Sequence, residues 1–158
     1  MVSVQNLEFE LQNLFKEKKF SKIIFEITTK TKENERTSGL FVLLGISRIS
    51  LNRKNKDQVE QAVSDFKKGY FKELNSENSL NALINLALAS VILSDFENTN
   101  VDFDEIKNFY KSSPESFQNK RPINIAMTTI YSRLNDFEGM VFHLEKVIKS
   151  GDFISNDL

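Results

Sequence analysis

The stretch YSRLNDFEGMVFHLEKV, residues 131–147, decides the predicted fold. It starts with the aromatic Tyr131, followed two positions later by the basic Arg133 and then by Leu134. After Asn135 comes the order Asp-Phe-Glu at residues 136–138. Apolar side chains then follow at steps of four and three, at Met140, Leu144 and Val147. Steps of this size put side chains on one face of a helix. The stretch therefore predicts a helix end, a tight turn and a second, amphipathic helix.

The same order of residue types recurs twice along the chain. It is found in LFKEKKFSKIIFEI, residues 14–27, and in LALASVILSDFE, residues 86–97. Together with residues 131–147, these segments resemble the tetratricopeptide repeat. Leu11 and Gly45 occupy the same position of the motif and lie 34 positions apart, which is the period of that family.

The resemblance implies an all-α fold, an alpha-alpha superhelix of about four helical hairpins and about eight helices. Residues 1–158 are expected to form a single tetratricopeptide-like domain. Its repeats are expected at about 4–37, 38–76, 79–120 and 121–153. A helical bundle built from the same helices is the alternative.

Turn-forming residues separate the predicted helices. Five Gly and two Pro among 158 residues are too few for a turn-rich β-sandwich. Ser, Asn, Asp and Pro, which close turns and cap helices, instead mark every expected break except the first, where residues 16–19 are Lys-Glu-Lys-Lys. The breaks lie at 16–19, 32–37, 52–57, 75–79, 95–104, 112–121 and 135–136. Within them we expect Asp57, Ser76 and Asp102 to be N-caps.

Small residues are expected where a first and a second helix cross closely, because only a short side chain leaves room for the facing helix. The positions that supply them are Gly45, Ala62, Gly69 and Ala87.

Charge and cysteine content exclude several classes of protein. The 21 Lys and Arg residues against 22 Asp and Glu leave a net charge of -1, without the basic surplus that favours nucleic acid. The absence of Cys excludes disulfides, thiol nucleophiles and zinc fingers of the Cys type. The amino-terminal residues do not resemble a secretory signal, and no apolar run approaches the roughly 20 residues that cross a bilayer. We therefore expect a cytoplasmic protein with neither a nucleic-acid nor a membrane partner.

No catalytic, cofactor-binding or metal-binding constellation is predicted, so the chain is not expected to be an enzyme. The only histidine, His143, lies within an amphipathic helix and is expected to have a structural role. The acidic run from Asp95 to Glu105 superficially resembles a calcium loop, but it lacks the glycine of that loop and has Ile106 in place of the final glutamate. No glycine-rich phosphate loop is present.

The resemblance implies a concave groove lined by the first helix of each repeat. Its register puts Glu8, Gln12 and Phe15 on the groove face of the first repeat. The protein-binding groove is further expected to contain Val42, Ile46, Ile49, Ile84, Asn85, Leu88, Val91, Ile125, Thr129 and Arg133. Most of these side chains are apolar and are costly to leave in water, at about 25 cal/mol per Å².

The expected function is therefore a non-catalytic protein-protein interaction scaffold. An apolar or amphipathic helical segment of a partner would lie in the groove, with Asn85, Thr129 and Arg133 fixing its orientation. Alternatively, strong curvature closes the groove, so that its residues are core. A second functional interpretation is an amino-terminal docking or dimerisation domain of a larger enzyme, since degenerate repeats of this sort resemble the leading domains of some bacterial glycosyltransferases and sulfotransferases. Nucleic-acid binding by a helical solenoid would require a basic groove, and the groove contains only Arg133.

The end of the chain predicts an open apolar face. Phe153, Ile154 and Leu158 follow Gly151 without the polar helix that usually covers a last repeat. We expect this end either to form a homodimer contact or to be joined to further protein.

Overall fold

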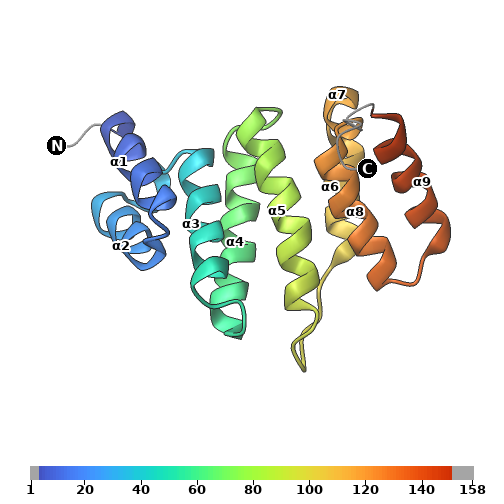
Figure 1. Ribbon diagram of the computed structural model, residues 1–158, viewed down its shortest axis with the longest axis horizontal. Helices are drawn as coiled ribbons and strands as arrows, with labels where there is room; N and C mark the ends of the chain where they lie inside the picture. Colours follow the sequence, from blue (N-terminus) through green and yellow to red (C-terminus); the bar gives the residue numbers. More distant parts are fainter. Residues whose placement is uncertain (1–3, 151–158) are drawn as a thin grey trace, which may run out of the picture. The chain divides into compact units, whose positions relative to one another are not determined.

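The computed structural model describes residues 4–150, and side chains from residue 6 onward. This part of the chain is all-α, as predicted, and it contains no strand. Its elements are α1 (Val4–Lys16), α2 (Phe20–Lys30), the short 3-10 helix η1 (Glu33–Glu35), α3 (Ser38–Asn52), α4 (Lys56–Lys72), α5 (Glu77–Leu93), α6 (Phe103–Ser112), α7 (Glu115–Gln118), α8 (Arg121–Arg133) and α9 (Phe137–Lys149) (Figure 1). The short helix α7 lies inside the predicted break at 112–121 and raises the number of described α-helices to nine.

The chain divides into two compact units. The first comprises residues 1–82, with α1 to α4 and the first turns of α5. The second comprises residues 83–158, with the remainder of α5 and α6 to α9. The closest helix pairs are α3 with α4 and α8 with α9, which lie side by side in Figure 1. Short connections of this kind make consecutive helices pack as hairpins.

The core of the first unit has α3 at its centre. Leu40 and Leu44 of α3 join an apolar cluster with residues from α1 and α2. The other members of that cluster are Leu7, Leu11, Ile23 and Ile27. On another side of α3, Phe66 of α4 is almost completely buried. The two helices α3 and α4 approach closely because Gly45 has no side chain at this point, where a Cβ would lie only 2.6 Å from the Phe66 ring.

The small residues predicted from the sequence lie at close helix contacts or in the core. A Cβ on Gly69 would lie 3.3 Å from the backbone oxygen of Ser38, and Ala62 and Ala87 are fully buried. Gly139, which the motif did not single out, is equally constrained, because its Cβ would lie 2.1 Å from the Tyr131 ring.

Two of the three predicted N-caps are confirmed. The Asp102 carboxylate accepts a hydrogen bond from the Glu105 backbone N–H, and the Ser76 hydroxyl accepts one from Ser79. The prediction for Asp57 is wrong, because Asn55 caps α4 by accepting from Gln58. Asp57 lies in the first turn of α4 instead, where its negative charge interacts favourably with the positive end of the helix dipole.

Three helix pairs fall inside predicted repeat ranges, namely α1–α2 in 4–37, α3–α4 in 38–76 and α8–α9 in 121–153. The division into repeats stays a prediction. The expected apolar end at Gly151, Phe153, Ile154 and Leu158 lies outside the described residues. Among the described helices, none has both the length and the apolar character needed to cross a membrane.

Replacement of Gly45 by alanine tests the close approach of α3 and α4. The new methyl group must displace the Phe66 ring. Overpacking of this kind costs about 1–3 kcal/mol and exceeds the gain of roughly 1 kcal/mol in helix propensity. We expect Gly45→Ala to lower the free energy of unfolding in urea. Gly39→Ala in the same helix is the control, because its Cβ would lie 3.4 Å from the Asn78 side chain and should leave stability unchanged or raised. Equal free energies of unfolding for Gly45→Ala and Gly39→Ala would contradict the close approach of α3 and α4 at Gly45.

Candidate functional site

A hollow in the first unit brings together residues that the register of the repeat resemblance placed on the groove face. We call it the α1–α3 hollow. It has a volume of about 330 Å³ and is lined by Glu8, Gln12, Phe15, Gly39, Leu40, Val42, Leu43, Ile46 and Asn78. Glu8, Gln12, Phe15, Val42 and Ile46 were all predicted to face the groove, whereas Ile49 is not among the lining residues.

Helical spacing explains how the α1–α3 hollow is built. Glu8, Gln12 and Phe15 lie at steps of four and three on α1, and Val42 and Ile46 lie one turn apart on α3. The Thr37 hydroxyl, which caps α3, donates a hydrogen bond of 2.9 Å to the Glu8 carboxylate. This bond ties α1 to the start of α3. The result is an apolar floor with a carboxylate and two amides at its rim.

A second hollow lies in the second unit, with a volume of about 600 Å³. Its lining includes the predicted groove residues Val91, Thr129 and Arg133. The Arg133 guanidinium is bonded to the Asp95 carboxylate, and the Thr129 hydroxyl donates to the backbone oxygen of Ala126. Two of the three polar groups that were expected to orient a partner are therefore engaged within the chain. A ligand carboxylate would have to compete with Asp95 for Arg133.

The remaining predicted groove residues lie outside both hollows. Ile49, Ile84 and Asn85 are half-buried, whereas Leu88 and Ile125 are 38% and 45% exposed. Of the ten residues assigned to the groove, only Val42 is buried. These side chains therefore contribute surface rather than core.

A buried polar network surrounds Asn124 in the second unit. The Asn124 amide group donates to the backbone oxygens of Gln118 and Lys120, at 2.7 and 2.8 Å. Its oxygen Oδ1 therefore faces His143 Nδ1, at 2.8 Å. Because this oxygen can only accept, the Nδ1 of His143 carries the proton. Tyr110 lies 3.2 Å from the same oxygen and accepts a bond from Lys146.

Burial holds His143 in its neutral form. The side chain is 2% exposed, and its ring stacks on Tyr131 and meets the edge of Tyr110. Desolvation, together with the positive charge of Lys146, lowers the pKa of His143 to about 4. Burial alone raises the pKa of Tyr110 to about 12. An enclosed, neutral imidazole held by an amide has the structural role expected from the sequence.

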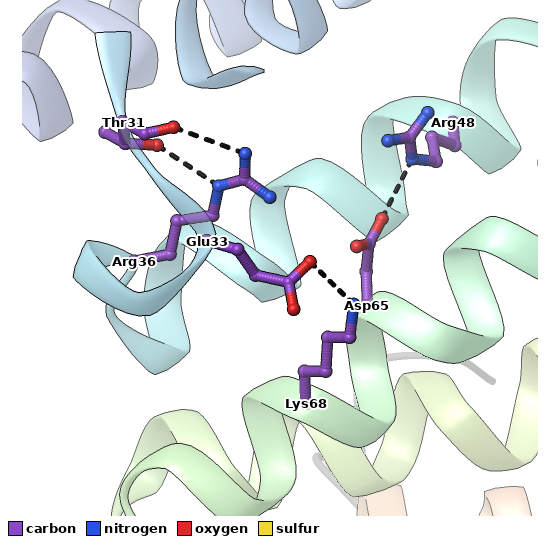
Figure 2. A network of polar contacts seen from close by, with 6 residues as sticks. All are labelled: Thr31, Glu33, Arg36, Arg48, Asp65 and Lys68. Atoms are coloured by element: carbon purple, nitrogen blue, oxygen red, sulfur yellow. Dashed lines mark hydrogen bonds and ion pairs between the residues drawn. The ribbon is translucent and has the colours of Figure 1, made fainter. Parts of the chain in front are cut away.

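A buried ion pair joins α3 to α4 in the first unit. Arg48 Nε donates to the Asp65 carboxylate at 2.8 Å, and Asp65 is 6% exposed (Figure 2). Burial raises the pKa of Asp65, and this effect outweighs the opposite effect of Arg48. The sequence contained a signal for this pair, because Arg48 and Asp65 each interrupt an apolar helix face. The same view shows Lys68 pointing to Glu33 and Arg36 pointing to Thr31.

Within residues 4–150, no cluster of three or more His, Asp or Glu side chains is arranged to hold a metal ion. Comparison of the chain with protein-family models, with curated proteins and with solved structures found no match. The resemblance to tetratricopeptide repeats therefore rests on the residues quoted above.

The buried His143 predicts a specific dependence of stability on pH. Its pKa in the folded protein is lowered from 6.5 to about 4, so its contribution to stability is complete above pH 6.5 and is lost as the pH falls toward 4. We expect the stability difference between the wild type and His143→Gln to shrink over this range, by at most about 1.4 kcal/mol per pH unit. Urea unfolding of both proteins at several pH values measures this difference in the free energy of unfolding. Titrating groups that the two proteins share contribute equally to both, so their effects cancel in the difference. A difference independent of pH would contradict the prediction.

Proposed function

We propose that this protein is a non-catalytic scaffold for protein-protein interaction, which binds an apolar or amphipathic helical segment of a partner at the α1–α3 hollow. One observation carries the proposal: five residues that the register of the repeat resemblance assigned to the groove face line a single hollow. The tetratricopeptide-like repeat character and the cytoplasmic location expected from the sequence belong to the same proposal.

The lining residues define the chemistry of the partner. Phe15, Val42 and Ile46 favour an apolar side chain, whose burial contributes about 1.5–3 kcal/mol. Glu8 is the only charged residue in the lining, and its carboxylate favours a Lys or Arg next to the apolar anchor. The volume of about 330 Å³ is near the lower limit of ligand pockets and accommodates side chains rather than a whole helix. We therefore expect a weak, transient interaction in which one side of a partner helix inserts its apolar residues.

Selection from a displayed library of random peptides tests the proposal, because it requires no identified partner. We expect the selected peptides to have large apolar residues at helical spacing with Lys or Arg beside them. Ile46→Asp should reduce their affinity about tenfold or more, because a carboxylate in the apolar floor leaves the anchor facing an unpaired charge. Binding is measured by fluorescence anisotropy with a selected peptide.

Leu51→Asp is the matched control. Leu51 also lies on α3 and is half exposed, but it is not part of the hollow. Affinity should be unchanged in this variant. If the selected peptides bind Ile46→Asp as tightly as the wild type while the helix content is retained, the α1–α3 hollow is not the binding site.

A second candidate function is a docking or dimerisation domain, such as those of larger bacterial enzymes. The observation that favours it is an exposed apolar stripe on α9, formed by Phe137, Val141, Leu144 and Ile148. Steps of four, three and four match the spacing of a helix-pairing seam. Such a stripe complements itself when two copies meet about a two-fold axis, so the proposed occupant is a second copy of the chain.

Light scattering after size-exclusion chromatography tests the second candidate. We expect a dimer that dissociates in Val141→Asp, because the substitution places a charge in the middle of the seam. Phe25→Asp is the control, since Phe25 is an equally exposed apolar residue on α2. A wild-type protein that stays monomeric at its highest soluble concentration, or a dimer that survives Val141→Asp, would refute dimerisation through α9.

A further inference from the structure

A second hollow in the first unit has a different chemical character. We call it the α3–α4 hollow. It has a volume of about 740 Å³ and lies between η1, α3 and α4. Phe41 and Phe71 contribute its apolar surface, and Lys67, Lys68 and Lys72 contribute three ammonium groups from α4. These α4 residues face the same side because they recur at helical spacing. No residue lines both this hollow and the α1–α3 hollow.

The charge at the α3–α4 hollow is strongly positive for a chain with a net charge of -1. Glu33 is the only carboxylate in its lining, and it accepts a 2.8 Å bond from Lys68 (Figure 2). Lys72 donates instead to the backbone oxygen of Asn34, a neutral group that leaves the ammonium charge uncompensated. The Asp65 carboxylate on the same helix is bonded to Arg48. The hollow therefore favours an anionic ligand.

The apolar surface restricts the kind of anion. Phe71 is 50% exposed, whereas Phe41 is buried, with the Arg36 guanidinium 5.9 Å from the centre of its ring. Lys68 and Lys72 lie about one helical turn apart, roughly 6 Å along the helix axis, so they match a chain of spaced carboxylates better than one compact anion. Contact with Phe71 adds an apolar requirement.

We propose that the α3–α4 hollow binds an acidic peptide segment that places an apolar side chain against Phe71. A carboxylate of the segment pairs with Lys72, and the apolar side chain covers the exposed ring. Glu33 competes with the segment for Lys68. A polyphosphate backbone is disfavoured, because the Glu33 carboxylate lies in the lining and the chain has no basic surplus.

The competition by Glu33 gives the proposal an unusual signature. Removal of the Glu33 charge should strengthen binding of an acidic segment, because Lys68 is released and a repulsive carboxylate is lost. Removal of a lysine charge should weaken it. Opposite effects from two exposed positions are difficult to produce by a general loss of structure.

The test uses the full chain and a fluorescent peptide in which glutamates flank a Leu-Phe pair. Anisotropy is expected to report binding that weakens with added salt. Lys72→Gln should weaken binding about two- to fivefold, and Glu33→Gln should tighten it by a similar factor. Phe71→Ser should also weaken it. Lys111→Gln, on α6 of the second unit, is the matched control and should leave affinity unchanged.

Three competitors distinguish the proposal from its rivals. The first is the same peptide with Gln in place of Glu, the second is oligothymidylate, and the third is inorganic phosphate. Weak or absent binding of all three supports an acidic, apolar peptide as the ligand. Equal binding of the Gln peptide, tighter binding of oligothymidylate, displacement by phosphate, or no binding of the acidic peptide would each overturn the proposal. Affinity unaffected by Lys72→Gln would overturn it as well.

Discussion

The Phe66 ring lies against the backbone of α3 where Gly45 has no side chain, and the first unit depends on this contact. It sets the separation of α3 and α4, and thus the position of both hollows that α3 helps to line. On its other sides α3 contributes Leu40 and Leu44 to the core shared with α1 and α2. A helix that is packed on so many sides has little freedom to shift. Both hollows are therefore bounded on one side by a closely packed helix, α3.

The two hollows of the first unit combine apolar surface with opposite charge. Glu8 gives the α1–α3 hollow an acidic rim, whereas the lysines of α4 give the α3–α4 hollow a basic one. Charge at a rim contributes more to the choice of partner and to the rate of association than to affinity, while the buried apolar contact contributes most of the binding energy. A near-zero net charge thus conceals a different balance of charged residues at each hollow, with one glutamate at the first and three lysines and one glutamate at the second.

Much of the fold could be predicted from local sequence, because helical periodicity, caps and turn residues act over a few positions. Ser76 and Asp102 are examples, and the choice of Asp57 over Asn55 failed because two neighbouring residues could both cap α4. The requirement for Gly45 was also visible in the motif. Gly139 was missed, since its constraint comes from Tyr131 of the preceding helix and depends on how two helices cross.

The candidate sites were less predictable, because they too depend on how helices distant in sequence pack against one another. The register of the repeat resemblance indicated which faces of α1 and α3 line the α1–α3 hollow, but it could not identify partners across helices. The bond between Arg133 and Asp95 and the pair Arg48–Asp65 both join residues distant in sequence. The basic hollow was missed because its phenylalanines come from two helices and its lysines look like an ordinary solvated face.

The Asn124 network gives the last helix an unusual mode of attachment. In α9 only His143 and Val147 are buried, and the His143 ring both packs on Tyr131 and bonds to Asn124. Apolar contact weakens gradually as surfaces separate, whereas hydrogen bonds are lost over a fraction of an ångström to an ångström or so. The hydrogen bond between His143 and Asn124 therefore requires α9 to lie in one position, and a small displacement of the helix breaks it. Loss of this bond would leave the buried Nδ1–H of His143 without its partner, which makes a partly detached α9 costly.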